Sequence, residues 1–298
     1  MRILLRALAA LVAAIAVALG LLYLLSNRKL NRTLTVQDAP PAIPTDSASI
    51  ARGRYLVRAI TKCVECHGEN LGGKLFIDAG PVGKVWSKNL TGGQGGVRDS
   101  LTPAQWTAAI RHGVAPNGRP LMVMPTTSYT VLGDDDLGAI IAYIKTVPPV
   151  DYVPPKSFLG PMGWFLYTTG RFPTLTEADL VRHDGPRAAV PAAGPTAEYG
   201  RYLTSIGGCT ACHGPTLSGG AIPGMPPGTR PAANLTPEGI GHYTEADFFT
   251  ALRTGKRPGG APIDSVMPYR FTREMTDDDI RAVYLFLKSV PRKPFGNR

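Results

Sequence analysis

All four cysteines of the 298-residue sequence lie in two copies of one five-residue pattern, Cys-x-x-Cys-His. Two thiols one helical turn apart can each form a thioether with a vinyl group of haem, and the adjacent imidazole can then bind the haem iron. The pattern therefore predicts two sites of covalent haem attachment. The residues concerned are Cys63, Cys66 and His67 in the first copy, and Cys209, Cys212 and His213 in the second.

Other uses of paired cysteines fit the pattern less well. A zinc site made from both pairs would join motifs that lie far apart in the chain, each with its own adjacent histidine. A thioredoxin-like pair would need an α/β pattern, which the sequence lacks, and disulfides would not require the histidine. Haem attachment is the favoured interpretation.

Methionines supply a candidate for the second axial ligand of each iron. A thioether ligand favours ferrous iron and raises the reduction potential. Met124-Pro125 follows the first motif at nearly the same distance as Met267-Pro268 follows the second, so Met124 and Met267 are predicted as these ligands. Met122 is the alternative in the first half.

The remaining histidines have no counterpart in the other half of the chain, and His112 aligns with Thr254. Structural roles are favoured for His112, His183 and His242. Replacement of a methionine ligand by His112 or His242 is the alternative, and it would lower the potential of that haem.

A repeat extends well beyond the haem motifs. In each half, Gly-Arg-Tyr-Leu precedes the motif, Asn-Leu-Thr follows it, an apolar helix comes next, and a final helix begins with three aspartates and ends at Val-Pro. Carboxylates in a first turn suit the positive end of the helix dipole, and Thr276 is a plausible N-cap. Apolar residues at helical spacing predict a core-facing stripe on each final helix. The stripes are Leu137, Ile140, Ile141 and Ile144 in the first half, and Ile280, Val283, Tyr284 and Leu287 in the second.

The first 32 residues predict a membrane anchor. Residues 7–25 form an unbroken apolar run, which is long enough to cross the ~30 Å hydrocarbon core as a helix. A cleaved signal peptide is the alternative, with 16–18 as the cleavage region, but the apolar run continues beyond it. Positive charge lies on both sides of the run, so it does not determine orientation.

The net charge of +10 allows a basic soluble surface, contact with anionic lipid or docking to an acidic partner protein. No basic run interleaved with aromatic residues is present, so nucleic acid is not an expected partner. The 28 prolines and 34 glycines indicate much loop structure. Within the linker, residues 158–172 are rich in aromatic side chains; packing between the domains is favoured, with contact to the membrane surface or a partner subunit as the alternative.

The repeat predicts an all-α fold of two tandem domains after a transmembrane helix. The expected divisions are an anchor at 1–32, a tether at 33–45, a first domain at 46–150, a linker at 151–190 and a second domain at 191–298.

With the motifs and both Met-Pro pairs placed, residues 46–150 and 191–298 resemble two class I cytochrome c domains. The chain is similar to the cytochrome c subunits of bacterial membrane-bound alcohol, aldehyde and gluconate dehydrogenases. The resemblance implies two covalently bound haem c groups and first and last helices that cross over each haem. It also implies periplasmic electron transfer to a quinone pool, another cytochrome or an oxidase. The best-known subunits of this type carry three haems, whereas this sequence has two motifs.

An electron carrier without catalytic activity is the leading functional hypothesis, because each iron would be held on both faces. Its expected partners are electron donor and acceptor proteins, including a dehydrogenase catalytic subunit, and its expected location is the bacterial inner membrane with the haem domains in the periplasm. A dihaem enzyme of the peroxidase or thiosulfate dehydrogenase type is the alternative, and it would need an open or cysteine-ligated iron. A purely structural subunit is a third hypothesis.

Overall fold

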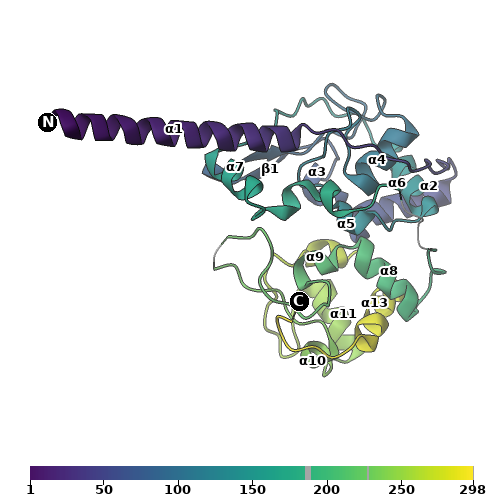
Figure 1. The fold of residues 1–298 in the computed structure, drawn as a ribbon. Helices are drawn as coiled ribbons and strands as arrows, with labels where there is room; N and C mark the ends of the chain where they lie inside the picture. Colours follow the sequence, from purple (N-terminus) through teal and green to yellow (C-terminus); the bar gives the residue numbers. More distant parts are fainter. Residues whose placement is uncertain (185–188, 227, 298) are drawn as a thin grey trace.

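The computed structural model describes residues 1–184, 189–226 and 228–297. Two helical domains lie one against the other, and a long N-terminal helix projects from the first domain (Figure 1). Most of the first domain is formed by α2 (Ser47–Tyr55), the π-helical turn η1 (Leu56–Ile60), α3 (Cys63–His67), α4 (Pro103–His112), α5 (Thr126–Tyr129) and α6 (Asp134–Thr146). The second contains α8 (Ala197–Ile206), α9 (Cys209–His213), α10 (Pro237–Ile240), α11 (Glu245–Thr254), α12 (Tyr269–Thr272) and α13 (Asp277–Ser289).

The first and last helices of each domain cross at a glycine. A Cβ atom added to Gly53 of α2 would lie 1.9 Å from the carbonyl oxygen of Ala139 in α6. A Cβ atom on Gly200 of α8 would lie 1.9 Å from the carbonyl oxygen of Ala282 in α13. The repeated glycine is therefore required for the backbones to approach this closely.

Helix limits and the core agree with the repeat. The predicted stripe of the final helix is confirmed in the first domain, where its four residues are buried, and in the second, where Ile280, Val283 and Leu287 are buried and Tyr284 is half-buried. Thr276 is confirmed as an N-cap, since its hydroxyl accepts from the Asp279 amide. The second-last long helix of each domain begins with a capping box, at Thr102 in α4 and at Thr244 in α11.

A small antiparallel sheet in the first domain was not predicted, so the fold is mostly helical rather than entirely so. Its strands are β1 (Leu75–Asp78), β2 (Gly83–Trp86) and β3 (Phe158–Leu159), in that order, with a 3₁₀ turn η2 (Gly80–Val82) between the first two. The third strand comes from the linker. Period-2 patterning is too short in these segments to be distinguished from loop.

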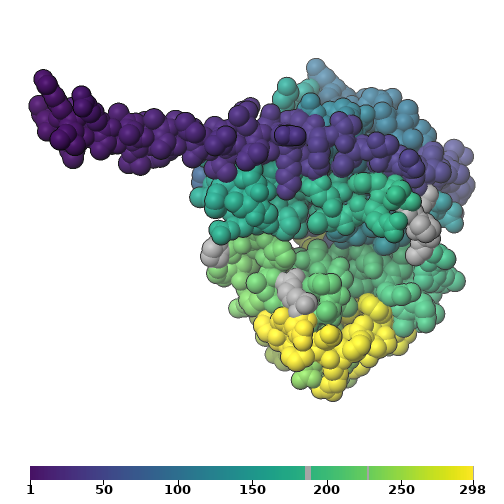
Figure 2. Space-filling view, in the orientation of Figure 1, coloured from purple at the N-terminus to yellow at the C-terminus, as the bar shows by residue number. Residues whose placement is uncertain are grey.

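The N-terminal helix α1 (Arg2–Leu30) is the candidate membrane span. Its most apolar 18-residue window has a mean hydropathy of 2.7, and none of that window is buried against the protein. In the space-filling view, most of the helix stands clear of the body (Figure 2). Its 29 residues correspond to about 44 Å at 1.5 Å per residue, which exceeds the thickness of the hydrocarbon core.

The predicted tether lies on the surface of the first domain. The Leu34 amide donates to the Gly118 carbonyl at 2.8 Å. A Cβ atom on Gly138 of α6 would lie 2.3 Å from the carbonyl oxygen of Ala42. Parts of the segment 33–45 are therefore packed against the first domain.

The aromatic part of the linker packs mainly beside α1. It contains α7 (Pro161–Thr168) and the 3₁₀ segment η3 (Pro173–Leu180). The Trp164 ring meets the Tyr23 ring of α1 edge-on with centroids 5.3 Å apart, and the Lys29 ammonium lies 4.3 Å from the centroid of the Tyr167 ring. Packing between the domains, the favoured expectation, is seen at Phe172, whose ring would lie 3.7 Å from a Cβ atom on Gly224 of the second domain.

The two domains meet through a reciprocal pair of tyrosines. The hydroxyl of Tyr55 in the first domain donates to the Asp279 carboxylate at 2.5 Å, and the hydroxyl of Tyr202 in the second donates to Asp136 at 2.6 Å. These tyrosines occupy equivalent positions of the repeat, as do the two aspartates. The contact is therefore close to two-fold symmetric, as in an isologous dimer.

Candidate haem sites

Each Cys-x-x-Cys-His motif forms a short helix between two residues with positive φ. Lys62, with φ of 52°, precedes α3, and Gly208, with φ of 68°, precedes α9. Gly68 and Gly214 follow the histidines with φ of 84° and 82°. A residue with a side chain would be strained at the latter positions, so the glycines let the chain turn away directly after the imidazole.

Both motif histidines are oriented by a backbone carbonyl. Nδ1 of His67 lies 2.8 Å from the carbonyl oxygen of Lys88, and Nδ1 of His213 lies 2.7 Å from that of Ala233. With Nδ1–H as donor, Nε2 is the nitrogen left to bind a metal, and the ring orientation is fixed. Burial lowers the pKa of His67, so its imidazole is kept in the neutral form that binds iron.

The four cysteines are half-buried, and no disulfide joins them. Burial raises the pKa of Cys63 and Cys209, and burial together with the charge of Glu65 raises the pKa of Cys66 to about 12. These environments differ from that of a redox-active pair, in which a lowered pKa creates a nucleophilic thiolate. The geometry is compatible with two thiols held for thioether attachment.

The two predicted methionine ligands share one local structure. The amide two residues after each methionine donates back to the methionine carbonyl at 2.8 Å, from Thr126 to Met124 and from Tyr269 to Met267. Both methionines pack, half-buried, against the same hydrophobic core as Cys63 and Cys209. Met122 packs instead against the cluster of buried linker residues.

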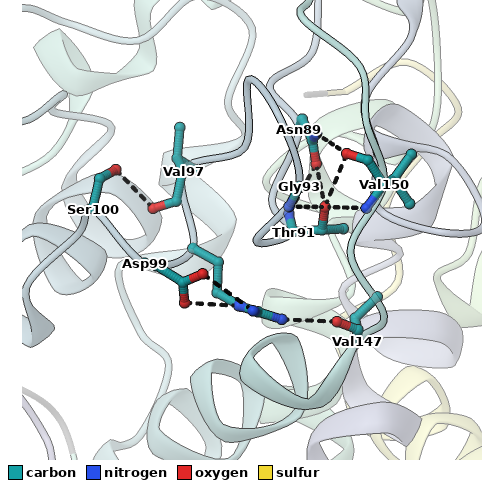
Figure 3. A network of polar contacts seen from close by, with 9 residues as sticks. Asn89, Thr91, Gly93, Val97, Asp99, Ser100, Val147 and Val150 are labelled. Carbon is teal, nitrogen blue, oxygen red and sulfur yellow. Dashed lines mark hydrogen bonds and ion pairs between the residues drawn. The ribbon is translucent and has the colours of Figure 1, made fainter.

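The repeated Asn-Leu-Thr segment connects the loop that contacts each motif histidine to the end of its domain by hydrogen bonds. In the first domain the Asn89 side-chain amide donates to the Val150 carbonyl at 2.7 Å, and its Oδ1 accepts from the amide and hydroxyl of Thr91 (Figure 3). In the second domain Asn234 makes the same contacts with Thr236 and the Lys293 carbonyl. The loop carries the carbonyl that orients the motif histidine, so this network supports the site.

The other histidines lie in polar or aromatic contacts within the protein. His112 bonds to Asp38 of the tether through Nε2 at 2.9 Å and approaches Nδ1 of His183 through its own Nδ1 at 3.2 Å. The His242 ring packs edge-on against Tyr243. These contacts agree with the structural roles favoured from the sequence.

The two motifs adjoin across the domain interface. Lys62, which immediately precedes Cys63, donates from its ammonium group to the carbonyl of Gly207, two residues before Cys209. A Cβ atom on Gly208 would lie 3.4 Å from the hydroxyl oxygen of Ser128 in the first domain. The starts of the two attachment helices therefore face each other, a relation that the positions of the motifs in the sequence did not indicate.

The residues present fit a haem in both domains. Each domain offers two thiols, an oriented imidazole and a thioether, and one of the thiols and the thioether pack against the hydrophobic core. In addition, Trp106 Nε1 in the first domain is buried and has no hydrogen-bond partner among the described residues. An unsatisfied buried donor suits a bound group that carries acceptors, such as the propionates of haem.

Several residues that shape the sites were missed from the sequence. Tyr55 and Tyr202 could have been noticed, because both belong to the repeated Gly-Arg-Tyr-Leu segment, yet nothing in the repeat indicates that each contacts the opposite domain. Asp38 lies in a segment without pattern and gave no signal. Lys62 aligns with Gly208 in the second half, so the comparison of the two halves did not single out the lysine.

Comparison with known proteins identifies both domains. Residues 48–144 match the family described as cytochrome c oxidase, cbb3-type, subunit III, and residues 197–291 match the cytochrome c family. The chain is 31% identical over 290 residues to the fructose dehydrogenase cytochrome subunit of Gluconobacter japonicus, covering 86% of this chain and 56% of that protein. It is 32% identical over 279 residues to the gluconate 2-dehydrogenase cytochrome c subunit of Pantoea cypripedii, covering 83% and 61%.

A dihaem relative is also similar. The chain is 30% identical over 217 residues to a diheme cytochrome c-type protein of Cereibacter sphaeroides, covering 64% of this chain and 66% of that protein. The chain spans somewhat more than half the length of the two dehydrogenase subunits. It therefore contains two cytochrome c domains with two covalently bound haem c groups, and it is similar to the cytochrome c subunits of dehydrogenases.

Proposed function

We propose that this chain is a membrane-anchored dihaem cytochrome that transfers electrons in the periplasm, from a dehydrogenase to a quinone, another cytochrome or an oxidase. The observation that carries the proposal is the placement of the two attachment motifs beside each other at a hydrogen-bonded domain interface. Bound haem supplies an iron that changes valence by one electron. The role of the protein is then to hold the two haems at a fixed distance and orientation.

The side chains around each site favour transfer over catalysis. Cys63 and Cys66 would attach the first haem, with His67 and Met124 as its axial ligands. Cys209, Cys212, His213 and Met267 would do the same in the second domain. An iron held on both faces leaves no position for a substrate, and the relatives named above are cytochrome subunits of dehydrogenases.

The proposed location is the bacterial inner membrane, with α1 as a single span. Haem c is attached outside the cytoplasm, and this supports a periplasmic position for both domains. The length and apolar composition of α1 support the span. The +10 net charge and the dehydrogenase relatives support docking to a partner subunit with an acidic surface.

Single substitutions of the methionines test the ligand set. Met124→Ala and Met267→Ala should each alter the optical spectrum of one haem and lower its potential, by part of the roughly 0.8 V range that axial ligands control. Haem should stay covalently attached in both variants. A redox titration followed by absorbance, together with haem-stained gels, measures both properties.

Met122→Ala is the matched control, because Met122 packs against the linker cluster and not against the haem-site core. It should leave both haem spectra and both potentials unchanged. Two unaltered spectra in Met124→Ala and Met267→Ala would contradict the ligand assignment. A high-spin haem in the wild-type protein would favour the peroxidase or thiosulfate dehydrogenase alternative.

A further inference from the structure

The linker helix α7 packs along the last turns of α1. Tyr23, Ser26 and Leu30 follow one another at intervals of three and four residues and so share a face of α1. Tyr23 contacts Trp164, Ser26 is the one buried residue of the helix, and Leu30 packs against the same cluster as Trp164. This seam joins the helix that would cross the membrane to the body of the protein.

The seam begins inside the apolar part of α1. The uninterrupted apolar run, residues 7–25, covers about 28 Å as a helix, which nearly equals the hydrocarbon thickness. Tyr23 belongs to this run, and the centroid of its ring is 5.3 Å from that of Trp164. If α1 spans the bilayer, α7 therefore lies at the depth where hydrocarbon gives way to head groups.

The outward face of α7 is apolar. The side chains of Met162 and Phe165 are three residues apart, and 47% and 37% of their respective surfaces are exposed. No charged residue occurs between 158 and 170. Figure 1 shows α7 at the end of the body from which α1 projects. If these exposed apolar residues did not contact the membrane, they would face water directly beside it.

Basic residues border this face. The guanidinium of Arg171 lies 5.5 Å from the centroid of the Phe165 ring, and Lys29 lies over Tyr167. Arg28, which precedes Lys29 on α1, is exposed. Tryptophan and tyrosine with flanking lysine and arginine are typical of the membrane–water interface, where the aromatic rings meet head groups and the cations meet phosphates.

We propose that α7 is a second membrane-contact element, which inserts Met162 and Phe165 into the head-group layer of the phospholipid bilayer. Combined with α1, it holds the first domain against the membrane in one orientation. The inference rests on the proposed membrane span of α1. A second copy of the chain or a partner subunit could also cover an apolar face, but neither would account for the coincidence of α7 with the end of the apolar run.

Site-specific photo-crosslinking tests the contact in the full-length holoprotein. Phe165→p-benzoylphenylalanine places the photoreactive group on α7, and Phe295→p-benzoylphenylalanine is the control, since Phe295 is 59% exposed near the C-terminus of the second domain. Both proteins are reconstituted in vesicles of phosphatidylethanolamine and phosphatidylglycerol and irradiated. Unchanged haem spectra establish that both are folded.

We expect phospholipid adducts, detected by mass spectrometry, at position 165 and none at position 295. A parallel carbonate wash of the vesicles reports separately on α1. Retention of the protein after the wash, with no lipid adduct at 165 or with adducts only to a second copy, would overturn the inference and leave the anchor in place. Release of the protein by carbonate would contradict the anchor, and the inference with it.

Discussion

The two domains place the same ion pair in different surroundings. In each, an arginine near the end of the second-last long helix binds the first aspartate of the acidic triplet: Arg111 binds Asp134 at 2.8 Å, and Arg253 binds Asp277 at 2.5 Å. The Arg111 side chain is fully buried, whereas 30% of the Arg253 side chain is exposed. The repeat thus preserves an interaction but not its environment.

Segments outside the repeat cause this difference. The tether brings Asp38 to within 3.5 Å of Arg111, and Asp38 also binds His112, which approaches His183 of the linker. In the second domain the Arg253 side chain is 30% exposed, and the residue that aligns with His112 is Thr254. The arginine forms a surface salt bridge in the second domain and belongs to a buried cluster in the first. The same substitution of Arg111 and of Arg253 should therefore lower stability by different amounts.

The largest loss of stability is expected at the helix crossing, which is the same in both domains. Gly53→Val and Gly200→Val would each force a side chain into a carbonyl oxygen at the helix crossing, and each should cost more than about 4 kcal/mol of stability. Gly20→Val is the control, because nothing lies within 4 Å of that position. Haem content and thermal unfolding measure the outcome. A fully loaded, stable Gly53→Val protein would show that the crossing can open.

The next largest loss of stability should differ between the two domains. Arg111→Gln removes the positive charge that is buried beside Asp38 and should cost about 3–5 kcal/mol, whereas Arg253→Gln should cost at most about 1 kcal/mol. Chemical unfolding of the detergent-solubilised holoproteins, followed through the haem absorbance, measures both values. Equal losses would mean that burial by the tether contributes nothing, and the contrast between the domains would then be superficial.

A smaller difference is expected at the domain interface. Tyr55→Phe leaves the buried Asp279 carboxylate without its tyrosine donor and should cost about 1–3 kcal/mol. Tyr202→Phe should cost less, because Asp136 keeps its ion pair with Arg52 at 3.0 Å. Double mutation should add little to Tyr55→Phe if the two contacts break together. Unfolding free energies of the three variants decide this.

The pH dependence of the same variants provides a check. Burial is the main cause that raises the pKa of Tyr55 and of Tyr202 above the ordinary value of 10.0. The stabilisation is therefore complete below about pH 10 and is lost as the pH rises further, because the unfolded chain ionises first. The wild-type protein should lose stability above pH 10 faster than Tyr55→Phe. Parallel pH curves would contradict the interface role.

Residue types and their spacing were enough to predict the chemistry and the main helices. Both haem motifs, the methionine candidates and the apolar stripes follow from residue type and spacing, since thioether attachment and helical packing each demand short, regular intervals. The acidic starts of the final helices were also evident, as was the glycine in each first helix.

The way in which the repeated units meet could not be predicted from the sequence. The reciprocal tyrosines, the approach of Lys62 to the second motif and the burial of Arg111 depend on contacts between segments that are distant in the chain. The small sheet and the α1–α7 seam likewise join regions without a shared pattern. Sequence periodicity reports which face of an element is buried, but it carries no information on which partner buries it.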